Sequence, residues 1–350
     1  MSDRTPVEAA GPASPVPGST RPAPTPWLRS GAVGIALAAL VTVIVLAFSW
    51  PGITSEPRGI HVAVSGPDQA VAQLEQALEA QSDTPLMLTE VADRDAAVTR
   101  IEQRKAYGAI VLGQKPEVLT ASAASPAVSQ MLTAMAAQLQ GQLTKQAAVA
   151  GAPAPTVTVT DTVPLLDTDP RGTGMVAAAF PLVLGGMLGG IVVSISVHGA
   201  RRRVTALLIY AVAAGLAVAG VMQGWFGVLT GSYLANAGAF ALSLLAIGAT
   251  IVGVATLVGR AGIAIGPILF LLVANPISSA AAPKEFLPGS WGEVGQWFPP
   301  GAGATLIRNL SYFPDASSTF PWLVLIVWAA GGLLLTTFAG LLHRRRARAA

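Results

Sequence analysis

Asp167, Asp169 and Arg171 are the residues best placed for chemistry, because they stand together just before a long apolar stretch. Two carboxylates beside a guanidinium could form a catalytic cluster, but acid–base or nucleophilic catalysis also needs a positioned partner such as histidine or serine. The sequence offers no Ser/His/Asp arrangement that would supply one. We therefore expect no enzyme. We expect Asp169 and Arg171 to pair and to fix how a folded domain joins the apolar stretch.

The other residues that could carry chemistry are scattered. The chain has no cysteine, which excludes disulfides and thiolate sites, and its three histidines lie in three different segments (His61, His198 and His343). None of the four lysines follows a glycine as a phosphate-binding loop requires. We expect no metal, no cofactor and no ATPase activity of the chain's own.

The stretch from Gly172 to Pro283 contains only four charged residues, Arg201, Arg202, Arg203 and Arg260. The whole chain is 52% hydrophobic and 11% charged, whereas soluble domains carry about 25% charged residues. A soluble domain must cover its surface with polar groups, so this stretch belongs in lipid. The arginines gather at segment ends, which indicates orientation in a lipid bilayer and not a nucleic-acid partner.

The spacing of the charges predicts six transmembrane helices, since about 20 helical residues cross a bilayer. Placing Arg201–Arg203 at mid-bilayer would cost roughly 7 to 10 kcal/mol, so we expect a loop there. We read residues 31–50 as an uncleaved anchor, with a cleaved signal peptide as the alternative. The expected spans are 31–50, four helices within 173–283 (Thr173–Val197, Val204–Met222, Ala235–Val258 and Ala261–Ala282) and Pro321–Leu342.

The fifth expected span is unusual. Only the thirteen residues from Gly262 to Ala274 precede the Asn275–Pro276 pair, and they make about 20 Å of helix. Either the helix continues, kinked, to Ala282, or it stops within the membrane. Both readings place Asn275 near lipid depth, where a polar side chain needs a partner or a wet cavity. We name Asn275, Pro276, Pro299 and Pro300 as candidates for a transport pathway or gate, with a plain proline kink as the alternative.

Four glycines in the second span form two overlapping Gly-x-x-x-Gly pairs: Gly185, Gly186, Gly189 and Gly190. Small residues at this spacing let another helix approach closely. We expect a role in helix packing.

Between the first two spans, residues 51–172 have the composition of a folded domain. Ile60–Ser65 alternates like a strand, and Ser125–Pro126 opens a long amphipathic helix. The expected fold class is therefore an α-helical polytopic membrane protein with six transmembrane helices and an extracytoplasmic α/β domain between helices 1 and 2. Residues 1–30 read as a disordered cytoplasmic tail, 284–320 as an extracytoplasmic interfacial or re-entrant segment, and 321–350 as the last helix with a basic cytoplasmic tail.

Orientation follows from the basic residues. With six crossings, all the arginine clusters fall on one side, which should be the cytoplasm, together with both termini. The α/β domain and residues 284–320 then lie outside.

Three groups of short motifs run along the chain in a fixed order: Tyr107–Leu112 with Leu119–Pro126, Val163–Leu165 with Asp169–Gly172, and Asn275–Ser278 with Phe298–Ala302. With the layout of one span, a large external domain and five spans, residues 30 to 345 resemble the ABC-2 family of membrane permeases, in its bacterial branch similar to phage-infection proteins. The resemblance implies an exporter in the bacterial plasma membrane that works as a homo- or heterodimer. It also implies a separate cytoplasmic ATPase as partner.

Two functions follow from these expectations. The first is an ABC-2-type permease subunit that exports an apolar or amphiphilic compound or a cell-envelope component. Spans without carboxylates argue against a proton-driven pump, which needs a buried acid as relay. The second is a membrane-anchored surface binding or scaffold protein, similar to a phage receptor, in which the external domain binds a partner and the spans only anchor it.

Overall fold

The computed structural model describes residues 25–79 and 85–349, with side chains described as far as Arg345. The chain divides after Leu46 into two compact units. Most of the expected N-terminal tail lies outside the described residues. Its last residues are already helical, because α1 runs from Trp27 to Thr54 and includes Pro51.

Five helices among the described residues are long and apolar enough to cross a membrane, as expected of a helical membrane protein. The third of them is interrupted near its end, because α6 passes into the π-helix η1 (Gly220–Trp225). The five are α1, α5 (Thr173–Ser196), α6 with η1 (Ala200–Trp225), α7 (Tyr233–Val258) and the first part of α10 (Thr319–Ala349).

Of the two readings of the fifth span, the structure shows the one in which the helix ends before the Asn275–Pro276 pair and does not continue to Ala282. The segment consists of the 3-10 helix η2 (Arg260–Ala264) and the π-helix η3 (Pro267–Ala274), and it is shorter than the five long helices. The amide of Asn275 makes the last hydrogen bond of η3, to the carbonyl oxygen of Phe270 at 3.0 Å. Pro276 has no amide hydrogen, and Ser279 has a φ of 56°, so the helix cannot continue. Arg260–Ala274 spans roughly 22 Å, short of a hydrocarbon core of about 30 Å.

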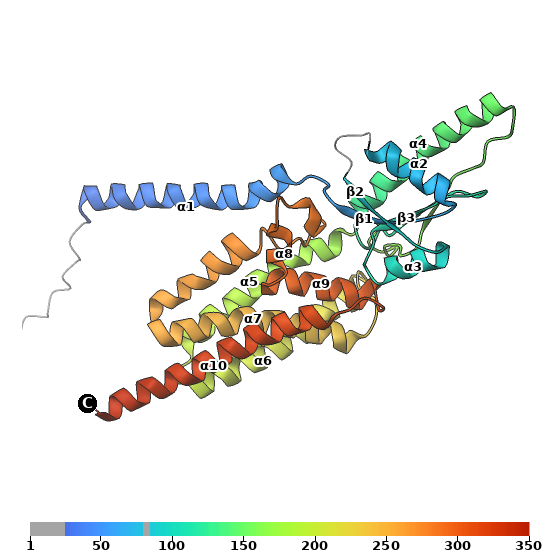
Figure 1. The fold of residues 1–350 in the computed structure, drawn as a ribbon. Coiled ribbons are helices and arrows are strands. Elements are labelled where there is room, and N and C mark those ends of the chain that lie inside the picture. Colours follow the sequence, from blue (N-terminus) through green and yellow to red (C-terminus); the bar gives the residue numbers. More distant parts are fainter. Residues whose placement is uncertain (1–24, 80–84, 350) are drawn as a thin grey trace, which may run out of the picture. The chain divides into compact units, whose positions relative to one another are not determined.

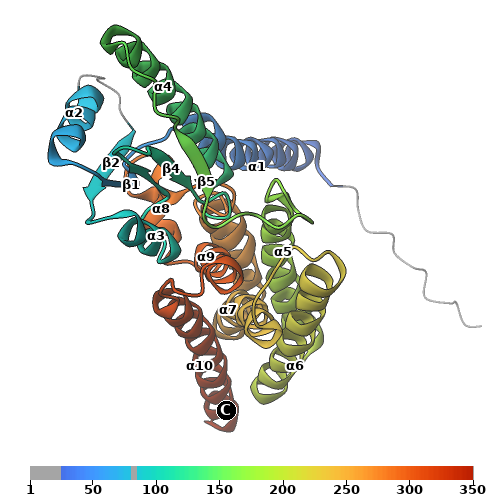
Figure 2. The ribbon, with the colours of Figure 1, turned by 90° about the vertical axis from the view of Figure 1, so that its right-hand side faces the viewer.

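Helix α7 is the centre of the bundle. Helices α5, α6 and α10 all pack on it (Figure 2), and it buries residues along its whole length. The α5 contact depends on glycine: a Cβ atom added at Gly186 would lie 2.8 Å from Ile247 Cβ, and one at Gly190 would lie 2.9 Å from the carbonyl oxygen of Gly248. Neighbouring backbone cannot rotate away, so glycine sets the distance between these helices.

The Arg201–Arg203 cluster is not a loop, contrary to expectation, because it forms the first turn of α6 (Ala200–Ala219). Arg203 donates hydrogen bonds to the carbonyl oxygens of Val197 at 2.8 Å and Ser194 at 2.9 Å. It also donates to the hydroxyl of Thr256 on α7 at 2.8 Å. The last carbonyls of α5 lack helical partners, and a guanidinium satisfies them while keeping the arginines at a helix end.

Residues 60–161, which we call the α/β lobe, contain a five-stranded sheet in the order β2-β1-β3-β4-β5. All neighbours are parallel except β3 and β4, which pair antiparallel with Gly108 opposite Thr120. The strands are β1 (Ile60–Ser65), β2 (Leu86–Glu90), β3 (Gly108–Val111), β4 (Glu117–Thr120) and β5 (Thr158–Asp161), and the helices are α2 (Asp68–Glu79), α3 (Arg94–Glu102) and α4 (Pro126–Ala150).

Helices cover both faces of the sheet, with α3 on one face and α2 and α4 on the other (Figure 1). The core on the α3 side includes Phe313, and the core on the α4 side includes Phe286. Both phenylalanines come from the segment before α10, which contains η4 (Lys284–Phe286), α8 (Trp291–Gly295) and α9 (Pro299–Tyr312). The lobe therefore completes its two cores with side chains from the C-terminal third of the chain.

Candidate functional site

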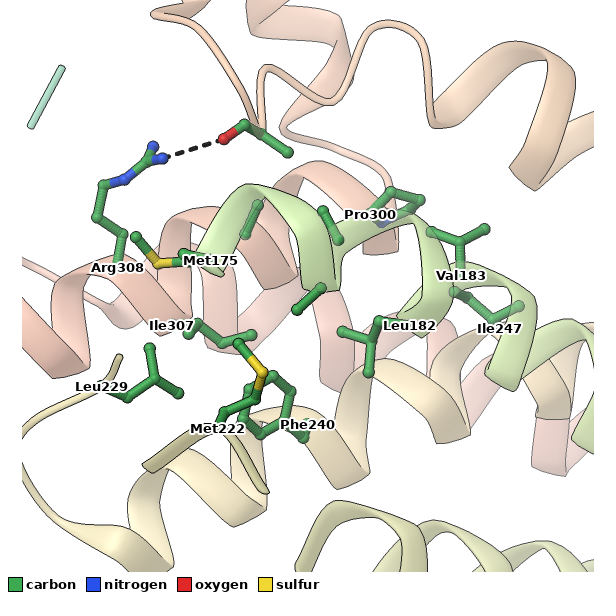
Figure 3. Close-up of a pocket in the computed structure, with 14 residues that line it drawn as sticks. Met175, Leu182, Val183, Met222, Leu229, Phe240, Ile247, Pro300, Ile307 and Arg308 are labelled. Carbon is green, nitrogen blue, oxygen red and sulfur yellow. Dashed lines mark hydrogen bonds between the residues drawn. The ribbon is translucent and has the colours of Figure 1, made fainter. Parts of the chain in front are cut away.

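A small, partly open apolar cavity, which we call the central cavity, lies between α5, α7 and α9 (Figure 3). Its volume is about 30 Å³. Met175 and Leu182 of α5, Phe240 of α7 and Ile307 of α9 line it, and Arg308 closes one end. A cavity of this volume holds a water molecule or two, so the central cavity is closed to any larger ligand in this structure.

Two larger open grooves adjoin the central cavity. The α6-side groove, between α5 and α6, has a volume of about 710 Å³ and shares Ala178, Leu182 and Met222 with the cavity. The α1-side groove, between residues 48–55, α5 and residues 275–287, has a volume of about 560 Å³ and shares Ala179 and Ala280 with it. Ligand sites of drug-sized molecules occupy about 300 to 1,000 Å³. The grooves are large enough for a ligand, and the central cavity is a constriction between them.

Residues 275–283, which we call the gate segment, line the α1-side groove, and Ala280 among them also lines the central cavity. Arg308 donates a hydrogen bond from Nη2 to the carbonyl oxygen of Ala280 at 3.0 Å, and Gln296 donates from Nε2 to that of Ser278 at 3.2 Å. Thr305 of α9 holds Gln296 in turn, through a 2.6 Å hydrogen bond to its Oε1. This irregular wall is therefore attached to α9 by a few side-chain hydrogen bonds.

The four residues expected to form a pathway or gate lie around these cavities. Asn275 and Pro276 line the α1-side groove, and Pro300 lines the central cavity. Pro299 is buried in the first turn of α9 beside Pro300, where proline suits the helix start. Asn275 and Pro276 thus begin the gate segment, whereas Pro299 and Pro300 form the first turn of α9.

Sequence reasoning missed the role of Arg308 and of the small residues Ala178 and Ala280. Alanine carries no chemical signal, so a cavity wall made of it reads as ordinary packing. The arginine did carry a signal, because it is the single charged residue within the aromatic and apolar stretch 294–314.

Asp169 and Arg171 do not form the expected pair. The Asp169 carboxylate accepts hydrogen bonds from the amides of Thr173 at 2.9 Å and Gly174 at 2.8 Å, so it caps the N-terminus of α5. Arg171 is exposed, and no ion pair joins the two within the described part of the chain. Capping wins because the first amides of α5 have no other partners. Asp169 also lines the α6-side groove.

The four expected packing glycines divide between two neighbours of α5. Gly186 and Gly190 face α7, as described above. A Cβ atom added at Gly189 would lie 2.3 Å from the ring of Tyr210 on α6, and one at Gly185 would lie 3.5 Å from its hydroxyl. That hydroxyl donates to the carbonyl oxygen of Gly185 at 2.7 Å. The glycines therefore position the C-terminal half of α5 against both α6 and α7.

Polar contacts join the α/β lobe to the segment that carries Arg308. Arg104 Nη1 donates to Asn309 Oδ1 at 2.6 Å, and its guanidinium carbon lies 5.4 Å from the centre of the Phe313 ring. The Tyr107 hydroxyl donates to Glu285 Oε2 at 2.7 Å. Burial lowers the pKa of Arg104, and burial together with the Glu285 charge raises the pKa of Tyr107.

Neither a metal site nor a relationship to known proteins emerges. No group of three or more His, Asp or Glu side chains among the described residues is placed to hold a metal ion. Comparisons with protein-family models, curated proteins and solved structures give no match.

Proposed function

We propose that this chain is a permease subunit of the ABC-2 type, which exports an apolar or amphiphilic compound or a cell-envelope component across a bacterial plasma membrane. The observation that carries the proposal is the small central cavity between two open grooves beside α5. A helix with ligand-sized grooves on two sides and a constriction between them has the parts that alternating access requires.

The topology that goes with this proposal has six crossings. Arg260–Ala274 serves as a short fifth crossing, and both termini face the cytoplasm. The α/β lobe and the segment before α10 then lie outside. Support comes from the basic residues, because Arg201–Arg203, Arg260 and the C-terminal arginines then share one side.

Movement of the outer half of α5 would open the cavity. Pro181 lies inside α5 and lines the α6-side groove. A proline removes one helical hydrogen bond and makes the helix easier to bend at that point. Gly186 and Gly190 hold the inner half on α7. Bending at Pro181 would therefore shift Met175 and Ala178, which line the cavity, and leave the inner half in place.

Energy for export would come from a separate cytoplasmic ATPase, with the permease present as a homo- or heterodimer. The five long apolar helices contain no Asp or Glu in their described residues, and a proton-driven pump needs such a group as relay. The apolar lining of the cavity fits a non-covalent transport step without cofactor.

The test is purification from native membranes in a mild detergent, followed by measurement of ATP hydrolysis in the eluate. Membrane vesicles are then assayed for ATP-dependent movement of a lipophilic fluorescent dye. The proposal expects an ATP-hydrolysing partner that elutes with this chain and dye movement that disappears when the gene is deleted. Two results together would contradict the proposal and favour the scaffold function. The purified chain would elute without ATPase activity, and vesicles from the deletion strain would move the dye as well as those from the wild type.

A further inference from the structure

The charge of Arg308 has no anionic partner in the structure. Its one hydrogen bond goes to the carbonyl oxygen of Ala280, and its Nε atom is buried without any partner. No ion pair of Arg308 is present among the described residues. Because a guanidinium stays charged in proteins, an unmatched buried one costs free energy unless an anion arrives.

The charged groups nearby do not supply that anion. Glu285 accepts the hydroxyl of Tyr107 and lies 4.0 Å from the Lys284 ammonium. Glu293 pairs with Lys284 at 2.6 Å. Arg104, a second buried guanidinium, acts on Arg308 as a like charge. None of these carboxylates pairs with Arg308, whose charge therefore remains available to an anionic ligand.

Further donors lie on the gate segment next to Ala280. The Ser279 hydroxyl is buried and has no hydrogen-bond partner in the described structure. Asn275 lines the α1-side groove with its side chain. Away from these groups the lining is apolar, with Met175, Leu182 and Ile307. A polar, positive end joined to an apolar cavity matches a molecule with one charged head and a hydrocarbon tail.

We propose that Arg308 and the Ser279 hydroxyl bind the head group of a single-chain anionic amphiphile, a carboxylate or a phosphate, while its tail occupies the central cavity and the adjoining grooves. This inference deepens the proposed function, on which it rests, by naming the substrate class. A carboxylate or phosphate adds the attraction of opposite charges to its hydrogen bonds with a guanidinium, which a neutral carbonyl cannot do. The head group therefore displaces the Ala280 carbonyl from Arg308 and frees the gate segment.

Binding to the purified full chain in nanodiscs tests the inference without any ATPase. The probes are hexadecanoate, a lysophosphatidate with the same chain length, and hexadecanol, which has the same tail without charge. For the wild type we expect both anions to bind about tenfold or more tighter than the alcohol. Equal binding of hexadecanol and the two anions would overturn the proposal.

Arg308→Gln should reduce anion binding to the level of hexadecanol, and Arg308→Lys should retain part of the preference. The matched control is Arg171→Gln, which removes an exposed arginine and should change nothing. If Arg308→Gln does not fold, Ser279→Ala serves instead and should weaken anion binding by several-fold. An unchanged preference for anions in the folded Arg308→Gln variant, or in Ser279→Ala, would contradict the assignment.

Two lipid compositions identify the source of the ligand. In discs of zwitterionic lipid alone, the probes compete with no other anion. If added phosphatidylglycerol displaces hexadecanoate from the wild type but leaves the residual binding of Arg308→Gln unchanged, the head group of a bilayer lipid occupies the same site, which supports the shared chemistry. If the chain prefers anions but the vesicles show no ATP-dependent movement of the dye, the proposed function is contradicted while the binding site is supported.

Discussion

The contact between α5 and α7 and the contact between the α/β lobe and α9 hold the molecule in opposite ways. The first is dry and depends on backbone-to-backbone approach at Gly186 and Gly190. The second depends on the side-chain hydrogen bonds of Arg104 and Tyr107 to Asn309 and Glu285. Close packing at a glycine has no alternative arrangement, whereas a hydrogen bond can exchange its partner for water or a ligand. The first contact is therefore a rigid frame, and the second is the adjustable one.

The largest effect should come from filling the dry contact. Gly190→Leu places a side chain where the Gly248 backbone leaves no room, so we expect a loss of about 3 kcal/mol or more in the free energy of unfolding. The matched control is Gly331→Leu on α10, because a Cβ atom at Gly331 meets nothing within 4 Å. Thermal unfolding in detergent measures both. A Gly190→Leu variant as stable as Gly331→Leu would show that this contact is not rigid.

The next effect tests the lobe contact. Asn309→Ala removes the acceptor of Arg104, leaving a buried guanidinium without that partner, and should cost about 2 to 3 kcal/mol. The loss should be local, with faster amide hydrogen exchange in α3 and β3 and unchanged exchange in α7. Thr305→Ala is the control, since Thr305 is on the same helix but bonds Gln296. Uniformly faster exchange through α7 would mean that the two contacts are not independent.

A smaller effect concerns pH. The pKa of Tyr107 is raised by burial and then by the Glu285 charge, whereas an unfolded tyrosine ionises near pH 10. The folded protein thus keeps a proton that the unfolded chain loses above about pH 10. This contribution is complete below pH 10 and declines by up to about 1.4 kcal/mol per pH unit above it.

Tyr107→Phe should remove that decline. Denaturant unfolding of wild type and variant between pH 9 and 11.5 measures the two slopes. The variant should also be less stable at pH 7.5 by about 1 to 2 kcal/mol, since Glu285 loses a donor. If the free energy of unfolding changes with pH at the same slope in both proteins, the Tyr107 hydroxyl is exposed to water and takes no part in the lobe contact.

The smallest effect should come from a charge pair inside the lobe. The hydrogen bond from Arg94 to Glu117, 2.6 Å long, lowers the pKa of Glu117, with a further contribution from the Thr160 hydroxyl. A lowered pKa stabilises the fold above the usual carboxylate pKa of about 4.3, and the contribution is lost as pH falls below it. Because Arg94 is exposed, Arg94→Gln should cost less than about 1 kcal/mol at pH 7 and nothing at pH 3. A larger loss at pH 7 would mean that the pair is not solvent-screened.

Local patterns in the sequence predicted much of the fold. Charge-free lengths located the long helices, and Ser125 marked the start of α4, where its hydroxyl accepts the amide of Val128. The end of the fifth span could not be predicted, because a proline allows a helix either to kink or to end. The tertiary contacts of the gate segment decide between the two. The Arg201–Arg203 loop was wrong, because an arginine side chain can reach the open carbonyls of a neighbouring helix from a helical turn.

The candidate site was predicted only in part. Asn275 and Pro276 were identified because a polar residue and a proline are conspicuous in an apolar stretch. The Arg104–Asn309 bond was not, since it joins residues 205 positions apart. The cavity walls were not predicted either, because the sequence does not distinguish an alanine or leucine that lines a cavity from one that packs in a core. Asp169 was assigned the wrong partner because sequence proximity suggested Arg171, while the helix start offered two amides.

The most direct test uses the absence of native cysteine. Ala178→Cys places one thiol where the central cavity meets the α6-side groove, and Gly331→Cys places one on the exposed side of α10. Both are labelled with a bulky maleimide, and ATP-dependent movement of the lipophilic dye is measured in vesicles before and after labelling. We predict that labelling at residue 178 reduces movement to background and that labelling at residue 331 leaves it unchanged. Full movement with residue 178 labelled would contradict a path beside α5.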